Sequence, residues 1–278
     1  MNVNLVVKIL GYVCLLQALA TLPGVLYTAR FEHMMLPAFS FALLVAVVTG
    51  GCFLTYEYRH RHHYLRLAID GVRQDFSVRE AMAMLSCGWL LVSILGALPY
   101  WFSGHFTLIE AVFENISSIT TTGVSVIPLG THYASSLVWW HIWGQWLGGI
   151  GEIIVFVLLL ARLGSEVGNL FSAEVQGVSA ERTMSRAGKS VRMTCWLYAA
   201  LTAVLAILLW LTGLTWAPAV QLAMVTLSTG GFVHLQNLML EQGSWLRELI
   251  ILFFMLIASL NFVLFYRVLW QGRWRIIK

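Results

Sequence analysis

The chain has 278 residues, of which 59% are hydrophobic and only 11% are charged. In soluble domains about a quarter of all residues are charged. This composition therefore excludes a water-soluble protein and indicates an integral membrane protein. The net charge of +4 does not indicate nucleic acid as a partner, because no basic stripe with base-stacking aromatic residues accompanies it.

The first two predicted elements are membrane spans that form a hairpin. Val3 to Tyr27 and about Met35 to Tyr56 are each long enough to cross a bilayer, which requires about 20 helical residues. The first run is longer than the apolar region of a signal peptide and lacks an Ala-x-Ala cleavage site, so we expect a retained span. Residues 1–57 are therefore predicted to be an N-terminal transmembrane hairpin.

The charge of the polar connections predicts the topology. Five arginines and three histidines lie between Glu57 and Glu80, and more basic residues lie at 164–193 and at the C-terminus, whereas Arg30 and Arg247 fall on the opposite side. Because basic loops stay in the cytoplasm, we expect a multi-pass protein with both termini cytoplasmic. The HRHH run beginning at His60 is more typical of a juxtamembrane loop than of a metal site, since paired ligands are lacking elsewhere.

The first predicted repeat occupies residues 58–163. It comprises a third span (Ala81 to Phe102), a short helix (Thr107 to Ile119), a turn and a fourth span (about Ser136 to Leu163). Thr107 and Glu110 form the pattern of a capping box. A helix of this length reaches about 20 Å, which is too short to cross, so it is expected to dip in and turn back with its carbonyl end favouring a cation. Three tryptophans are expected to form an interfacial belt: Trp139, Trp140 and Trp143.

The second predicted repeat occupies residues 194–278, after a cytoplasmic connection at 164–193. It comprises a fifth span (about Thr194 to Leu214), a short helix that opens at Thr215 with Pro218 in its first turn, and a sixth span (about Leu249 to Trp270). An ungapped alignment of Gly123 with Gly231 also pairs Thr107 with Thr215 and Thr121 with Thr229. The chain therefore contains an internal repeat with a Thr/Gly turn at its centre.

Both turns are polar and broken by glycine, whereas the sequence around them is apolar. A membrane tolerates irregular backbone only where it is buried in protein or lines a watery cavity, so the turns indicate a pore. A phosphate-binding loop is disfavoured, because no Gly-Lys-Ser/Thr follows either turn.

Four motifs together resemble the Trk/Ktr potassium-uptake superfamily, in particular its TrkH-type members. They are ITTTGVS (119–125), STGGF (228–232), QWLGGIG (145–151) and GWLLVSILGALPYWFSG (88–104). The resemblance implies an all-α integral membrane protein with six transmembrane helices and two re-entrant pore helices that carry filter-like loops. It covers the N-terminal half of the family pattern, which has an extra hairpin and four membrane–pore–membrane repeats.

The resemblance implies transport of potassium ions across a plasma membrane, the inner membrane in a bacterium. Potassium would be the substrate, with no organic cofactor, no transition-metal site and no enzymatic activity. A cytosolic nucleotide-binding regulatory subunit would contact the cytoplasmic connections. The residues leave open whether flux is passive or is a symport coupled to sodium or protons.

Potassium coordination requires oxygen atoms that replace the hydration shell, and inward-pointing backbone carbonyls supply them. Glycine allows the strained backbone and the close approach that such a turn needs. The predicted filter residues come from both turns: Thr120, Thr121, Thr122, Gly123, Ser228, Thr229, Gly230 and Gly231. Glu152, which follows the GGIG run in the fourth span, is a possible intramembrane charge site, although a packed interface or a protonated state would also explain it.

Two turns make half of the four-turn ring that the resemblance implies. We expect the pore to be completed by a second copy or by a chain that carries the missing repeats, with membrane lipid around it. The alternative hypothesis is a non-conducting regulatory or truncated half-protein that needs a partner chain.

Overall fold

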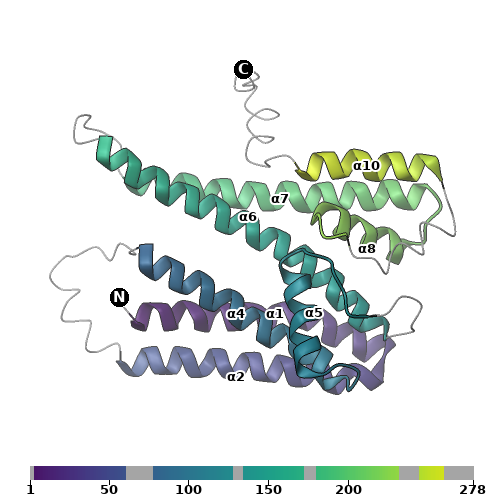
Figure 1. Ribbon diagram of the computed structural model, residues 1–278, viewed down its shortest axis with the longest axis horizontal. Coiled ribbons are helices and arrows are strands. Elements are labelled where there is room, and N and C mark those ends of the chain that lie inside the picture. Colours follow the sequence, from purple (N-terminus) through teal and green to yellow (C-terminus); the bar gives the residue numbers. More distant parts are fainter. Residues whose placement is uncertain (1–2, 61–77, 128–133, 172–179, 232–243, 260–278) are drawn as a thin grey trace. The chain divides into compact units, whose positions relative to one another are not determined.

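The computed structural model describes residues 3–60, 78–127, 134–171, 180–231 and 244–259 (Figure 1). Within these ranges every regular element is helical, as the predicted all-α class requires. The α-helices are α1 (Val3–Phe31), α2 (Leu36–His60), α4 (Val78–Phe102), α5 (Leu108–Ile119), α6 (Ser135–Phe171), α7 (Ala180–Leu211), α8 (Trp216–Leu227) and α10 (Trp245–Ser259), and a single 3₁₀ turn, η1 (His33–Met35), joins α1 to α2.

Four stretches within the described helices are long and apolar enough to cross a membrane. They are Val3–Phe31, His33–His60, Arg79–Phe102 and Val191–Leu211, and they coincide with the predicted first, second, third and fifth spans. The predicted fourth span lies along α6, which continues to Phe171. The predicted sixth span is described only as far as Ser259. The number of six spans therefore stays a prediction.

The chain divides into two compact units. One contains Met1–Ile116 with Val126–Trp140, and the other contains Ser117–Ser125 with His141–Lys278. The first turn thus belongs to the unit that also holds the second repeat. This division does not test the predicted boundaries of the repeats, which stay predictions.

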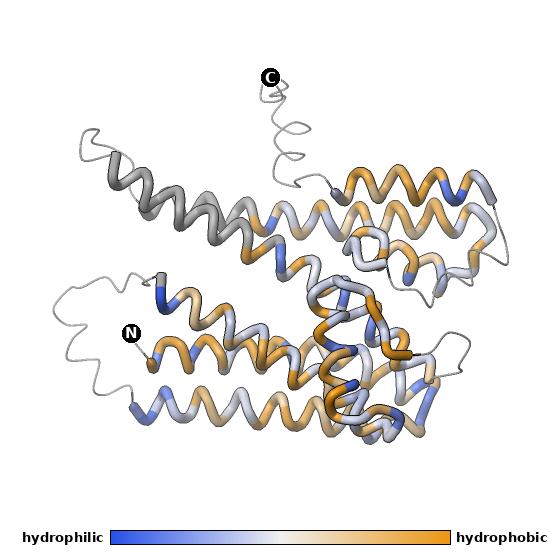
Figure 2. Tube along the Cα trace, in the orientation of Figure 1, coloured by the Kyte–Doolittle hydropathy of each residue, from blue (hydrophilic) through white to orange (hydrophobic). Residues whose placement is uncertain are grey.

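In the first unit, α1, α2 and α4 lie side by side (Figure 1). Small side chains let them approach closely: Cys14, Ala18 and Ala46 form a buried cluster with Leu95 of α4. The end of α2 and the start of α4, on the side of the N-terminus, are hydrophilic (Figure 2). There, Asn4 Nδ2 donates a hydrogen bond of 3.5 Å to the carbonyl of His60. The start of α1 and the end of α2 therefore lie at the same end of the unit.

The predicted tryptophan belt is wrong for Trp140. This side chain is only 3% exposed, its Nε1 donates a hydrogen bond of 2.9 Å to the carbonyl of Gly96, and its ring lies edge-on to Phe39 at 5.7 Å between centroids. Trp139 stacks on Tyr27 at 5.7 Å. Trp140 is a core residue because α4 offers its indole both space and a hydrogen-bond acceptor.

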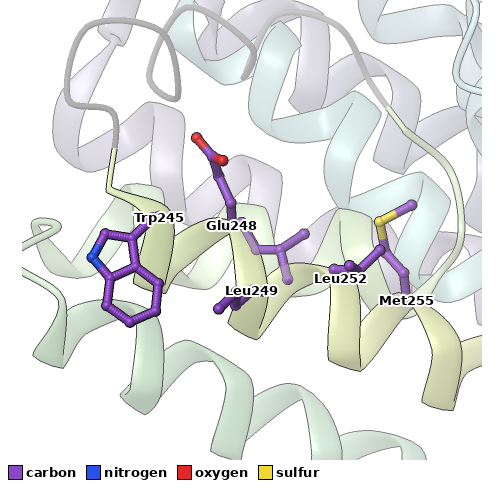
Figure 3. A pocket seen from close by; sticks show the side chains of 6 residues that line it. Trp245, Glu248, Leu249, Leu252 and Met255 are labelled. Atoms are coloured by element: carbon purple, nitrogen blue, oxygen red, sulfur yellow. The ribbon is translucent and has the colours of Figure 1, made fainter.

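In the second unit, α10 is amphipathic in an unusual sense. Arg247 is buried, and its guanidinium donates hydrogen bonds to the hydroxyl and carbonyl of Thr212 at the end of α7, at 3.2 and 3.3 Å. The exposed positions are mostly apolar but include Glu248, and a pocket on α10 is lined by Trp245, Glu248, Leu249, Ile251, Leu252 and Met255 (Figure 3). A mostly apolar outer face and a buried cation with hydrogen-bond partners suit a lipid or protein environment.

The N-terminus of α6 is capped from a distant part of the chain. The carboxylate of Glu32 accepts hydrogen bonds from the backbone N–H groups of Ser135 and Ser136, at 2.7 and 3.0 Å. These N–H groups have no partner within the helix, and a negative charge also suits the positive end of the helix dipole. Burial alone would raise the pKa of Glu32, but the hydrogen bonds from Ser136 and Ser135 outweigh it and hold the pKa below its usual range.

Replacing Glu32 with Gln is expected to destabilise the first unit by about 1 kcal/mol, the usual effect of losing a helix cap. Because folding lowers this pKa, the stabilisation is complete above the unfolded value of about 4.3 and is lost as the pH falls through the lower folded value. Thermal unfolding in detergent at pH 7 and below pH 4 measures both effects. Glu57→Gln in α2 is the control, and equal behaviour of the two variants would contradict the capping role.

Candidate functional site

The two short helices, α5 and α8, have the same construction. Each has 12 residues and begins directly after a threonine, Thr107 or Thr215. The predicted capping box of α5 is confirmed: the Glu110 carboxylate accepts a 2.8 Å hydrogen bond from the Thr107 N–H, and the Thr107 hydroxyl accepts a 3.3 Å bond from the Glu110 N–H. In α8, Thr215 has an extended backbone but makes no side-chain cap.

The turns after α5 and α8 close with equivalent hydrogen bonds. The N–H of Thr121 donates to the carbonyl of Ser118 at 3.0 Å, and the N–H of Thr229 donates to that of Thr226 at 3.2 Å. One residue later, Thr122 donates to Ser117 at 2.9 Å and Gly230 donates to Val225 at 3.2 Å. The alignment made from the sequence therefore also holds for the backbone.

Both turns place the same aligned positions in the left-handed region. The φ angles are +54° at Thr121 and +56° at Thr229, and +74° at Gly123 and +65° at Gly231. A β-branched residue with positive φ is an outlier, which costs about 1–3 kcal/mol and persists only where the surroundings impose it. Two threonines held this way at matching positions mark the turns as a constrained and specific conformation.

The two turns meet backbone to backbone. A methyl group placed on Gly123 would overlap the carbonyl oxygen of Gly230. The structure therefore brings these two predicted filter residues, one from each repeat, into direct contact.

The hydroxyl groups of the turns bond within their own turn. Ser228 Oγ donates to the Val225 carbonyl at 3.1 Å, and Thr229 Oγ1 donates to the Ser228 carbonyl at 2.7 Å. In the other turn, the Thr120 and Thr122 hydroxyls lie 2.8 Å apart, within hydrogen-bond distance. These groups hold the shape of the turns.

Glycines of α6 allow the helix to lie directly against the first turn. A methyl group on Gly144 would overlap Ser118 Oγ, and one on Gly148 would overlap the carbonyl oxygen of Ile119. Ser118 Oγ also donates a hydrogen bond of 2.6 Å to the carbonyl of His141. The GG-containing motif of α6 therefore serves the approach of a helix to a backbone turn.

The sequence analysis missed two polar residues that hold α5 and the segment after the first turn in place. Glu114 is fully buried, and its carboxylate accepts a 3.0 Å hydrogen bond from the N–H of Val126. Asn115 donates from Nδ2 to the carbonyls of Val92 and Ser93, at 3.2 and 3.0 Å. An acid and an amide side by side in an apolar membrane segment were the available signal, because such residues are costly there unless they have a role.

Glu152 is an exposed residue of α6. It is close enough to Tyr198 of α7 to interact with it electrostatically, and the Tyr198 hydroxyl donates to the carbonyl of Trp146 at 3.3 Å. Its role as a charge site stays a prediction. Among the described residues, no three His, Cys, Asp or Glu side chains gather as metal ligands would, and most of the HRHH run lies outside those residues.

Comparisons with known proteins agree on one family. The sequence model of TrkH, described as a cation transport protein, matches residues 60–278. An uncharacterized cation transporter of Methanocaldococcus jannaschii is 33% identical over 57% of this chain and 33% of its own length. The Trk system potassium uptake protein TrkH of Halomonas elongata is 27% identical over 98% of this chain and 55% of its own length.

The fold agrees as well. The crystal structure of the potassium transporter TrkH from Vibrio parahaemolyticus superposes with a TM-score of 0.80 at 23% identity, over 98% of this chain and 53% of that one. The chain thus spans about half or less of the length of these relatives. With four apolar helices long enough to cross a membrane, it is a multi-pass membrane protein.

The contact between α6 and the first turn predicts a severe effect of Gly148→Ala. The added methyl group meets backbone that cannot move away alone, so we expect a loss of about 1–3 kcal/mol of stability from overpacking. Gly51→Ala in α2 is the matched control, because nothing lies within 4 Å of its added methyl group and alanine favours a helix. Thermal unfolding in detergent compares them, and equal stability of the two variants would contradict the tight approach.

Proposed function

Because the chain belongs to the TrkH family of cation transport proteins, we propose that it forms part of a path for potassium ions across the bacterial inner membrane. The observation that carries the proposal is the pairing of two left-handed Thr-x-Gly turns, 121–123 and 229–231, in one compact unit. Several relatives are named as potassium uptake proteins, which favours potassium among the cations.

Backbone carbonyls of the turns are the proposed ligands. The residues concerned are Thr120, Thr121, Thr122, Gly123, Ser228, Thr229, Gly230 and Gly231. The turn hydroxyls already take part in local hydrogen bonds, so they support the turn while the carbonyls replace water around the ion.

These two turns form only part of the proposed pore. The ring that the family resemblance implies has four turns, and a half ring would leave polar backbone facing lipid at a cost of several kcal/mol per group. The remaining turns would come from further sequence of a longer protein, a second copy or another chain. A non-conducting regulatory role is the second candidate, and flux separates it from the first.

We expect the 278 residues, purified as a monomer in lipid vesicles, not to conduct potassium. Potassium flux and particle mass measured on the same preparation provide the test. Empty vesicles and vesicles with a potassium ionophore set the zero and full scales. A conducting monomer would show that two turns suffice, whereas conduction by a larger particle would identify what completes the ring.

Alanine at Gly231 is expected to reduce the preference for potassium over sodium. The substitution meets no atom of the described residues within 4 Å, but it forces a side chain into a left-handed position at a cost of about 1 kcal/mol. Gly213 at the end of α7 is the matched control, because it also has a positive φ, +96°, with nothing within 4 Å. Gly123→Ala should be more severe, since its methyl group overlaps the other turn.

Growth rescue of potassium-uptake-deficient cells and competition of sodium with potassium uptake measure these effects. The wild-type chain and Gly213→Ala should show the same preference, and Gly231→Ala a lower one. Unchanged preference in both Gly123→Ala and Gly231→Ala would remove these glycines from the ion path.

The proposed orientation places both termini and the 59–79 connection in the cytoplasm. In the first unit, the N-terminal end of α1 and the basic end of α2 lie together, which supports a common side. In a variant without the four native cysteines, an impermeant thiol reagent should label cysteines at positions 132 and 242 from outside, and not one at position 61. External labelling at position 61 would overturn the orientation.

A further inference from the structure

One polar side chain of α6 packs against both turns. Gln145 is fully buried, and a methyl group placed on Gly230 would lie only 2.5 Å from its Cδ and Oε1 and 2.8 Å from its Nε2. A methyl group on Gly123 would lie 3.2 Å from the same Nε2. A single amide therefore packs against the turn glycines of both repeats.

The contact with Gln145 explains why position 230 is a glycine. Its φ is not in the left-handed region, unlike those of Gly123 and Gly231, so conformational freedom does not explain a glycine there. The space that a side chain at position 230 would need is occupied by the amide of Gln145. A side chain at position 230 would therefore require the amide of Gln145 to move.

We propose that Gln145 is a positioning residue, a spacer whose length and bulk fix the position of the two touching turns relative to α6 and to each other, and thereby the preference among monovalent cations. This inference rests on the function proposed above. Backbone carbonyls discriminate between ions of different radius through their number and spacing, so a residue that fixes this spacing affects selectivity without touching the ion.

The amide acts through its size. Among the described residues, Oε1 of Gln145 has no hydrogen-bond partner, and Nε2 makes a long contact of 3.4 Å with His141 Nε2, one helical turn earlier. The side chain is therefore not held in a hydrogen-bond network that ties it to either turn. A side chain of equal reach and similar volume should replace it.

The test compares Gln145→Ala, which removes the spacer, with Gln145→Met, which keeps its length. Gln17→Ala is the matched control, because Gln17 is also a buried glutamine in an apolar helix, α1, but lies in the first unit. Two readouts are taken for each variant at equal amounts of folded protein. One is the competition of sodium with potassium uptake in deficient cells, and the other is the shift in unfolding temperature of the purified chain in potassium or sodium chloride.

We expect Gln145→Ala to lower the preference for potassium over sodium by about tenfold or more, which corresponds to about 1.4 kcal/mol of discrimination. Gln145→Met should stay within about threefold of the wild type, and Gln17→Ala should reduce only the yield of folded protein. If alanine lowers the selectivity and methionine preserves it, a merely structural role of Gln145 does not explain the result.

The remaining outcomes distinguish a failure of the spacer role from a failure of the proposed function. If the wild type prefers potassium and Gln145→Ala keeps that preference, the spacer role is overturned and the proposed function stands. If methionine and alanine lose the preference equally, amide chemistry rather than size is responsible, and the spacer role is again overturned. If the wild type, in a particle that conducts potassium, shows no preference in either readout, the proposed function fails and this inference fails with it.

Discussion

The contact of two bare backbone turns is the constraint on which the rest of the second unit depends. A side chain on Gly123 would overlap the carbonyl oxygen of Gly230, and a side chain on Gly230 would meet the amide of Gln145. In a membrane, polar backbone of this kind must be enclosed by protein, because each exposed group costs several kcal/mol. The glycine-lined face of α6 meets this requirement for the first turn, since Gly144 and Gly148 bring the helix against it.

Enclosure also needs fixed partners, and these come from parts of the chain that are far apart in sequence. Asn115 ties α5 to carbonyls of α4, and Glu114 holds the segment after the turn through Val126. Glu32 caps α6 across more than a hundred residues. Asn115 and Glu114 replace water that the membrane does not supply, so these buried polar side chains maintain the geometry of the backbone.

Features that depend on residues close in sequence could largely be predicted, whereas features that depend on contacts between distant residues could not. The capping box of Thr107 and Glu110 lies within four residues, and the helix that follows could be delimited from sequence. The repeat was visible because its Thr and Gly positions recur at a constant spacing. Trp140 was misplaced because its partner, the carbonyl of Gly96, comes from another helix. The position of Gln145 could not be inferred either, because it depends on how α6 packs against both turns.

The sequence difference between the turns also has a packing explanation. Thr122 and Gly230 are aligned and donate equivalent backbone hydrogen bonds, so the two turns need not differ for the sake of the backbone. Thr122 is exposed and shares a hydrogen bond with Thr120, whereas Gly230 is buried beneath Gln145. The repeats therefore keep one backbone conformation and differ where α6 contacts them. One helix, α6, supports both turns, so the two repeats cannot contact it in the same way. Their sequences therefore differ at the positions where α6 packs against them.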